Sequence, residues 1–231
     1  MKIRIKYAKT GVLRFIGHLD VMRYFQKAIR RAGLDIAYSQ GFNPHQQITF
    51  AAPLGLGVTS EGEYFDAEMH SVTTSADMVE RLNQTMVPGM EVKSVVALKE
   101  GAKTAMAVVA GSDYLISIRD GYLDGINLFS KAQAFYEQAE IPVIKVSKTK
   151  ETELDIKPFI YDLQVRGEQL YLLLSTGSTD NVKPELVLEA MCKFQGVAYE
   201  KMAFQIHRLE TYMRNEQGEL VSLLEAGEEI Q

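Results

Sequence analysis

Two spacings of apolar residues follow one another at the start of the chain and predict a strand and then a helix. In the opening stretch KIRIKYA, Ile3, Ile5 and Tyr7 alternate with basic residues, which is the two-residue period of a half-buried strand. Over residues 18–32 the apolar residues recur at steps of three and four, as on one face of a helix. This helical stripe consists of Leu19, Met22, Phe25, Ile29 and Ala32. Gly33 follows at a position typical of a helix C-terminus.

The pattern continues to a β-α-β-β-α-β series that ends near residue 100. DIAYS and QITFAA predict extended segments on either side of the turn-rich QGFNPH. GEYFDAEM alternates as a strand, SADMVERLNQTM has helical spacing after a serine cap, and PGMEVKSVVAL predicts a closing strand.

A comparable series restarts after the polar stretch KEGAKT at residues 99–104. AMAVVAGSDYLISIRD predicts a strand and INLFSKAQAFYEQAE a helix. Strands follow in PVIKVSK with ELDIKPFIYDLQVRG and in QLYLLLSTG, and KPELVLEAMCKF then predicts a helix and FQIHRLETYM a last strand. Helices on an antiparallel sheet in this order fit the ferredoxin-like architecture. The sequence therefore predicts an α+β protein of two ferredoxin-like units with antiparallel sheets, residues 1–100 with the basic helix and residues 105–231.

Positive charge is concentrated in the first 50 residues. They hold nine Lys and Arg against two acidic residues, whereas the other 181 residues hold 16 against 28. The whole chain has a formal net charge of −5. Such asymmetry indicates that one face meets a polyanion while the acidic remainder keeps the protein soluble.

The predicted first helix carries four of these cations on the face opposite its apolar stripe. They are Arg23, Lys27, Arg30 and Arg31. The cations expected beside them are Arg14, Lys6 and Lys9, with Lys2 and Arg4. A contiguous basic surface of this kind predicts contact with RNA phosphates. The alternative is a solvated helix face on which Arg30 and Arg31 favour the helix dipole.

Aromatic residues are interspersed with the basic ones and are candidate stacking platforms for unpaired bases. They are Tyr7, Tyr24, Tyr38 and Phe42. Aromatic residues near cations are more often part of a core, so a packing role stays open for each of them.

The stretch GFNPH forms a predicted loop that has both a structural and a functional interpretation. Gly41 permits a positive φ, Asn43 before Pro44 restricts the backbone, and Phe42 would then pack inward. In the functional interpretation, the loop with His45 lies beside the basic surface and contacts the nucleic acid.

Two histidines near the basic surface are candidates for acid–base chemistry. His18 opens the predicted helix and His45 ends the loop, and two imidazoles are what cleavage of RNA without a metal needs. A cap or a packed histidine explains His18 equally well. His18, His45 and Asp20 have no recognised metal-ligand spacing, so no metal site is predicted.

Other cofactor and targeting signals are missing from the sequence. Gly55 and Gly57 lack the third glycine of a dinucleotide fingerprint and the lysine of a phosphate-binding loop. Cys192 is the single cysteine, which excludes an internal disulfide and a cluster held by this chain alone. No cofactor is expected. The longest apolar runs are too short to span a membrane, so we expect a cytoplasmic protein with no membrane partner.

The N-terminal stretch resembles a known family. The residues that carry the resemblance are KIRIKYAKTGVLRFIGHLDVMRYFQKAIRRAGLDIAYSQGFNPHQQITFAAPLGLGVTSEGEYFDAEM, joined in the second half by ELDIKPFIYDL. They are similar to the radical-SAM-linked protein family, a bacterial domain of unassigned function found fused to, or encoded beside, a cobalamin-type radical SAM protein. This chain departs from the family pattern at Gly17, where members tend to have serine, and at Gln46 and Gln47, where they tend to have proline and a basic residue.

The resemblance and the charge pattern together lead to one expected function and two alternatives. The resemblance implies an accessory chain, with any radical chemistry on a radical SAM partner. We expect a non-catalytic protein that binds RNA for such a partner, in RNA modification. The alternatives are a protein–protein adaptor without nucleic acid and a metal-independent endoribonuclease that uses His18 or His45.

Overall fold

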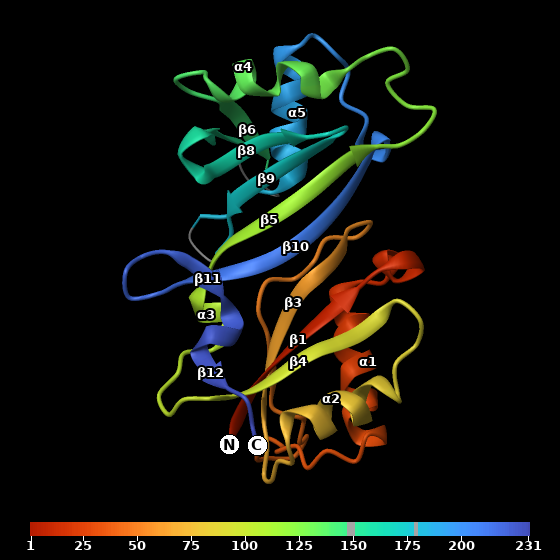
Figure 1. Ribbon diagram of the computed structural model, residues 1–231, viewed down its shortest axis with the longest axis vertical. Coiled ribbons are helices and arrows are strands. Elements are labelled where there is room, and N and C mark those ends of the chain that lie inside the picture. The colour runs from red at the N-terminus through yellow and green to blue at the C-terminus, as the bar shows by residue number, and fades with distance from the viewer. Residues whose placement is uncertain (147–150, 178–179) are drawn as a thin grey trace. The chain divides into compact units, whose positions relative to one another are not determined.

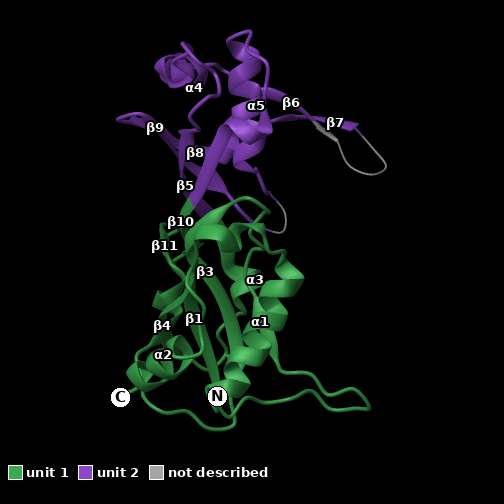
Figure 2. Cartoon of the chain, turned by 90° about the vertical axis from the view of Figure 1, so that its right-hand side faces the viewer, with its two compact units in different colours: residues 1–110, 208–231 green, residues 111–207 purple. Residues whose placement is uncertain are grey.

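The computed structural model describes residues 1–146, 151–177 and 180–231 and divides the chain into two compact units. Unit 1 contains residues 1–110 and 208–231, and unit 2 contains residues 111–207 (Figure 2). The chain thus crosses between the units twice. The predicted division into 1–100 and 105–231 has one crossing, and it differs because residues 208–231 return to unit 1.

The elements of unit 1 can be followed in Figure 1. They are β1 (Lys2–Lys9), η1 (Gly11–Phe15), α1 (His18–Arg31), β2 (Ile48–Phe50), β3 (Thr59–Glu68), α2 (Ser75–Asn83), β4 (Met90–Leu98) and α3 (Ala105–Val108), followed after the return by the end of β10 (Phe204–Arg214), β11 (Leu220–Ser222), η5 (Leu223–Ala226) and β12 (Gly227–Glu228). The predicted helix over 18–32 is α1. The predicted strand DIAYS forms only isolated bridges, Ile36 with Met69 and Tyr38 with Gln46.

Unit 1 has the strand order of a ferredoxin-like sheet. β4 and β3 each pair antiparallel with β1, and β2 pairs antiparallel with the outer edge of β3, which gives the order β4-β1-β3-β2. The returning segment adds to this sheet, because β10 lies beside β3, β11 pairs with β10, and β12 pairs with β4.

The core of unit 1 lies between the odd-numbered residues of β1 and the helices α1 and α2. Ile3, Ile5 and Tyr7 are buried against it, as their alternation predicts. The buried residues that α1 and α2 contribute are Val21, Phe25, Ala28, Ile29, Met78 and Leu82. Leu19 was expected in this stripe but is 59% exposed, because it falls on the same side of the helix as Arg23 and Lys27, four and eight residues later.

Unit 2 is built from a second series of elements. They are β5 (Val109–Ile118), η2 (Leu128–Lys131), α4 (Ala132–Tyr136), β6 (Pro142–Val146), β7 (Glu151–Asp155), η3 (Lys157–Phe159), β8 (Ile160–Arg166), β9 (Gln169–Ser175), α5 (Pro184–Phe194), η4 (Lys201–Ala203) and the first residues of β10. β9 pairs antiparallel with both β5 and β8, and β10 lies on the other side of β5. The order β10-β5-β9-β8 repeats that of unit 1.

A hairpin, β6 with β7, is inserted between the first helix and the second strand of this series and forms a separate two-stranded sheet. Apart from this insertion, both units follow the β-α-β-β-α-β order. The predicted α+β class with antiparallel sheets is therefore confirmed. Within the part of the chain that the structure describes, no helix has the length and apolar character needed to cross a membrane.

Candidate nucleic-acid interface

Four cations occupy the exposed face of α1. Arg23, Lys27, Arg30 and Arg31 are all exposed, because the opposite side of the helix packs Val21, Phe25, Ala28 and Ile29 into the core. Arg23 lies 3.6 Å from Asp20, and both side chains are more than 60% exposed. Within the described residues, no ion pair joins the other three cations to an acid. These four residues are called the α1 cations below.

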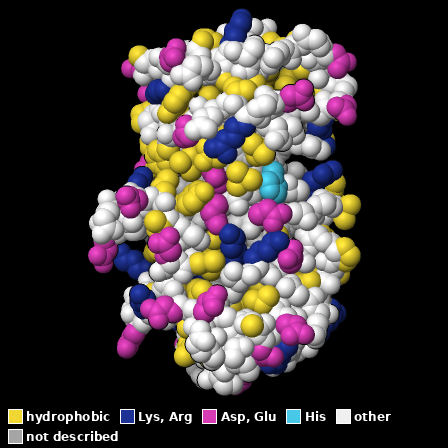
Figure 3. Space-filling model, viewed as in Figure 1, with side chains coloured by type: hydrophobic (Ala, Val, Ile, Leu, Met, Phe, Trp, Pro, Cys, Tyr) yellow, Lys and Arg dark blue, Asp and Glu magenta, His cyan; other side chains and the backbone are white. Residues whose placement is uncertain are grey.

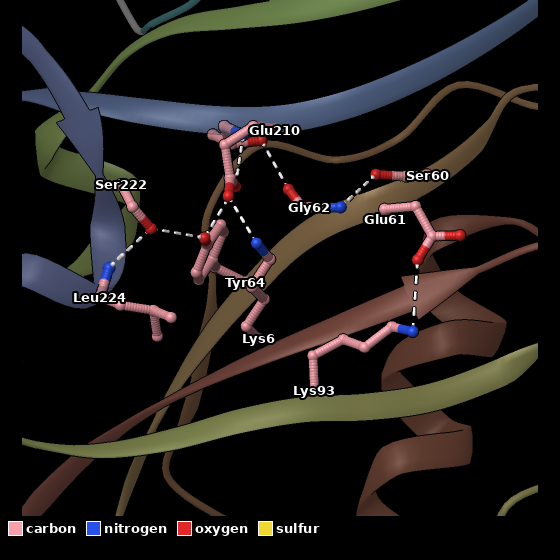
Figure 4. A network of polar contacts seen from close by, with 10 residues as sticks. Lys6, Ser60, Glu61, Gly62, Tyr64, Lys93, Glu210, Ser222 and Leu224 are labelled. Atoms are coloured by element: carbon pink, nitrogen blue, oxygen red, sulfur yellow. Dashed lines mark hydrogen bonds and ion pairs between the residues drawn. The ribbon is translucent and has the colours of Figure 1, made fainter. Parts of the chain in front are cut away.

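The basic residues of β1 do not extend this surface. α1 covers the face of the sheet that carries Ile3, Ile5 and Tyr7, so the even-numbered residues of β1 point to the opposite face. There Arg4 is fully buried and its Nε donates a 2.7 Å hydrogen bond to Asp66. Lys6 donates a 2.5 Å hydrogen bond to Glu210, which also accepts from Tyr64 (Figure 4). The expected contribution of Lys6 to one contiguous basic surface is therefore wrong.

Lys9 is buried and belongs to the interior. It follows the odd-numbered series of β1, is only 2% exposed, and its Nζ donates to the carbonyl oxygen of Ile16 at 3.2 Å. Burial lowers the pKa of Lys9, and the nearby carboxylate of Glu63 opposes that shift. The expectation that Lys9 contacts RNA is corrected by its position in the two-residue period of the strand.

Glu63 and Arg208 complete a buried charged group with Lys9. The guanidinium of Arg208 donates to Glu63 at 2.9 Å and to the carbonyl oxygen of Ala52 at 3.2 Å. Burial raises the pKa of Glu63. The positive charge of Arg208, hydrogen bonds with Ser60 and Arg208, and the positive charge of Lys9 oppose this rise. Because Glu63 and Arg208 are far apart in sequence, no local pattern signals their pairing.

Arg14 lies on η1, outside the face of α1. It is half-buried, and its guanidinium lies 4.8 Å from the centre of the Phe15 ring. Its carbonyl oxygen accepts a hydrogen bond from the backbone of Gly57 at 2.8 Å. Beside it, Val12, Phe15 and Leu19 expose 76%, 59% and 59% of their surface. An apolar area therefore adjoins the start of α1.

The two candidate histidines line different cavities. His18 is half-buried, packs edge-on against Phe50 with ring centres 5.3 Å apart, and lines a cavity of about 10 Å³ with Lys9 and Glu63. Burial lowers the pKa of His18. His45 is exposed, and its Nδ1 lies 2.8 Å from the hydroxyl of Ser39. The structure thus does not place the two imidazoles in one pocket.

The aromatic candidates separate into buried and accessible rings. Tyr7 is buried in the core, and the hydroxyl of Tyr24 accepts a hydrogen bond from the backbone of Val87. Tyr38 is 40% exposed, and Phe42 is fully exposed. The inward packing expected for Phe42 is therefore wrong, whereas Gly41 has the expected positive φ of 118°.

Polar groups elsewhere give no sign of a metal centre or a reactive thiol. Across residues 1–146, 151–177 and 180–231, no cluster of three or more His, Cys, Asp or Glu side chains is arranged to hold a metal. Cys192 is buried in α5, and burial raises the pKa of its thiol. On the face drawn in Figure 3, Lys and Arg side chains are mixed with Asp and Glu and form no continuous basic surface. The α1 cations are the candidate interface, because all four are exposed on one face of a helix.

Comparisons with known proteins place the chain in a family. No curated protein matches it. A solved structure described as "Crystal Structure of a Cbf5-Nop10-Gar1 Complex" contains a similar chain, with 11% identity and a TM-score of 0.47 over 96% of this chain and 52% of that one. This chain thus spans about half the length of that one, and a likeness of this size carries no argument about function. Residues 2–184 match the model of the family described as "Uncharacterized protein conserved in bacteria (DUF2344)", and the chain therefore belongs to this family.

Proposed function

We propose that this protein binds RNA through the α1 cations and acts as a non-catalytic accessory chain for a radical SAM enzyme that modifies the RNA. The observation that carries the proposal is the exposure of Arg23, Lys27, Arg30 and Arg31 on one helix face, where the ion pair of Arg23 with the exposed Asp20 is the only one that these cations make among the described residues. Like charges on neighbouring turns repel one another. A phosphate backbone relieves that repulsion and releases counterions.

The radical SAM partner is proposed from the sequence resemblance of residues 1–70 and from ELDIKPFIYDL. This chain has one cysteine, so a cluster bound by three cysteines needs another polypeptide. In this proposal the chain positions RNA, and the partner performs the chemistry.

The experiment compares RNA affinity of the wild type with that of Arg23→Ala/Lys27→Ala/Arg30→Ala across a salt series. Each phosphate contact contributes about −0.7 to the log–log slope with single strands, so loss of three contacts should make the slope about 2 less steep and weaken binding. The side chains are exposed, and such substitutions shift stability by about 0.5 kcal/mol or less. The fold should therefore survive.

The matched control is Lys183→Ala/Lys193→Ala/Lys201→Ala, which removes the same charge from exposed residues of unit 2. It should leave the slope close to that of the wild type. Equal losses in both triple variants would show that only net charge matters. A wild type that binds no RNA at about 0.1 M salt, where the screening length is about 10 Å, would contradict the proposal outright.

A protein–protein adaptor is the second candidate, and one observation favours it. Val12 and Phe15 on η1 and Leu19 at the first turn of α1 are exposed, and exposed apolar groups of this kind are common in protein interfaces. In that case Phe15→Ser/Leu19→Ser should abolish capture of the radical SAM partner, and neither the wild type nor this variant should bind RNA. The endoribonuclease alternative lacks such support, because His18 and His45 line different cavities.

A further inference from the structure

The loop that follows α1 is fixed at its base and presents its tip to solvent. Tyr38 and Gln46 form a backbone bridge. The backbone of Ser39 donates to the carbonyl oxygen of His45 at 2.8 Å, and the backbone of His45 donates to the hydroxyl of Ser39 at 3.1 Å. These bonds hold residues 38–46 as a short hairpin whose tip contains Phe42.

Phe42 exposes its whole side chain at this tip. A large apolar ring in water is unfavourable by the transfer free energy of its surface, and it contributes nothing to the core of unit 1. An aromatic ring accessible on both faces is the platform on which single-stranded nucleic acids stack their bases. The bases of a duplex are already stacked on each other and do not offer this contact.

The hairpin is attached to the helix that carries the α1 cations. The side-chain amide of Gln46 donates to the carbonyl oxygen of Gln26 at 3.2 Å and to the hydroxyl of Tyr38 at 3.3 Å. Gln26 lies in α1 between Arg23 and Lys27. The hydrogen bond therefore fixes the base of the hairpin to the middle of the basic helix.

An open pocket lies at the base of the same hairpin, on the face of the sheet opposite α1, because Lys2 and Asp66 line it. It has a volume of about 460 Å³, within the range of small-ligand sites. Its polar lining includes Lys2, Ser39, His45, Thr49, Glu68 and Thr104. Hydroxyl, imidazole and carboxylate groups together supply both donors and acceptors, which is what the edge of an unpaired base requires, and Lys2 adds a cation for its phosphate.

We propose that the hairpin at residues 38–46 and this pocket bind a single-stranded segment of RNA, in which one base stacks on Phe42 and a neighbouring base enters the pocket. The inference rests on the proposed RNA binding by α1 and specifies its substrate class. The α1 cations supply affinity that does not depend on sequence, Phe42 selects unpaired over paired RNA, and the pocket selects among bases.

Phe42→Trp and Phe42→Leu provide a matched pair of test variants. The chain contains no tryptophan, so Phe42→Trp introduces a single indole fluorophore at the proposed contact. A single-stranded octamer should quench its fluorescence, and a blunt duplex of the same length should not. Phe42→Leu keeps an apolar side chain but removes the ring, and it should weaken single-strand binding by about fivefold or more. Its duplex affinity and salt slope should equal those of the wild type.

The pocket is tested with homopolymers. Wild-type protein should prefer one of the four homopolymeric octamers, and Thr49→Val/Thr104→Val, which removes two hydroxyls of the lining, should reduce that preference. Equal affinity of the wild type for all four would overturn the role of the pocket.

The outcomes separate this inference from the proposal on which it rests. If wild type binds RNA and Arg23→Ala/Lys27→Ala/Arg30→Ala weakens that binding, but Phe42→Leu binds single strands as tightly as wild type, only the stacking site is wrong. If wild type binds neither single strands nor duplex, the proposed function fails and the stacking site fails with it. Quenching of the Phe42→Trp variant by the duplex as strongly as by the single strand would also overturn the inference.

Discussion

Units 1 and 2 share one strand order but use their first helix differently. In unit 1 this helix is α1, 14 residues long, with four exposed cations. In unit 2 the same position is taken by η2 and the five-residue α4, in which Gln133 is the one exposed polar residue. The strand order of the fold therefore does not determine where the charge lies. Of these two first helices, only α1 is long enough to carry cations on successive turns.

The interiors of the two units also differ in the number of charged side chains that they bury. Unit 1 buries five charged side chains, and the described part of unit 2 buries one, Asp113. Those of unit 1 are Arg4, Lys9, Glu63, Asp66 and Arg208. Two of these residues attach the returning segment, because Arg4 donates to the carbonyl oxygen of Leu223 at 3.0 Å and Arg208 donates to Glu63. Buried charges in unit 1 thus join segments that are far apart in sequence.

The largest loss of stability is expected from Arg4→Met, and it is expected in unit 1. The substitution leaves Asp66 buried without its cation and removes the bonds from Arg4 to Leu223 and Lys103. Loss of one partner from a buried pair costs about 3–5 kcal/mol. Unfolding in urea, followed by hydrogen exchange resolved by residue, should show this loss in unit 1 and little change in unit 2.

Arg4→Met/Asp66→Leu distinguishes a broken ion pair from a general packing defect. Replacing both partners by apolar residues removes the uncompensated charge, so the double variant should recover part of the stability. A single variant within about 1 kcal/mol of wild type would contradict this account of the buried pair.

Much of the fold could be predicted from the sequence because the apolar periods are local. Ile3, Ile5 and Tyr7 alternate as they face the core, and the helical spacing after residue 18 gives α1. The return of residues 208–231 to unit 1 could not be predicted, since it depends on pairs such as Arg208 with Glu63 that are separated by 145 residues. The polar residues of β10 have no period that indicates a partner.

The candidate site was predictable only in part, for a related physical reason. The exposure of Arg23 and Lys27 follows from helical spacing. The burial of Lys9 also follows from a period, since it continues the odd-numbered series of β1, but its positive charge suggested a surface position. Leu19 shows the reverse case, because an apolar residue at the first turn of α1 is exposed. No local pattern in the sequence indicates the pocket at the base of the hairpin or the place of His45 in its lining.

Lys9 is expected to make the stability of unit 1 depend on pH. Burial lowers the pKa of this lysine in the folded state, so folded protein binds fewer protons than unfolded protein between the lowered pKa and the ordinary value near 10.5. Lys9 should therefore make unit 1 more stable as pH rises through this window. Lys9→Met should lack that contribution, and urea unfolding of both proteins from pH 7 to 10 measures the difference in slope.

Lys27→Met serves as the control, because it removes an equal charge from an exposed position of α1. Its pH dependence should follow that of wild type. A Lys9→Met protein whose stability changes with pH as that of wild type does would show that Lys9 keeps its ordinary pKa in the folded protein.

The smallest expected effect is a gain in stability from Gly17→Ser, which would give α1 a cap that the corresponding segment of unit 2 already has. Asn127 accepts a hydrogen bond from the backbone of Ser130 at the start of η2, whereas Gly17 makes no side-chain cap. Gly17 has φ −78° and ψ 168°, which any residue adopts, and an added Cβ would lie 3.9 Å from the nearest atom, on Asp20. Serine in place of glycine at this position stabilises a helix by a few tenths of a kcal/mol. Thermal unfolding should show a small rise for Gly17→Ser and none for Gly17→Ala, which fits the same space but offers no acceptor. Equal rises would assign the gain to reduced freedom of the unfolded chain, and no rise in either would mean that the amides at the start of α1 are already satisfied by water.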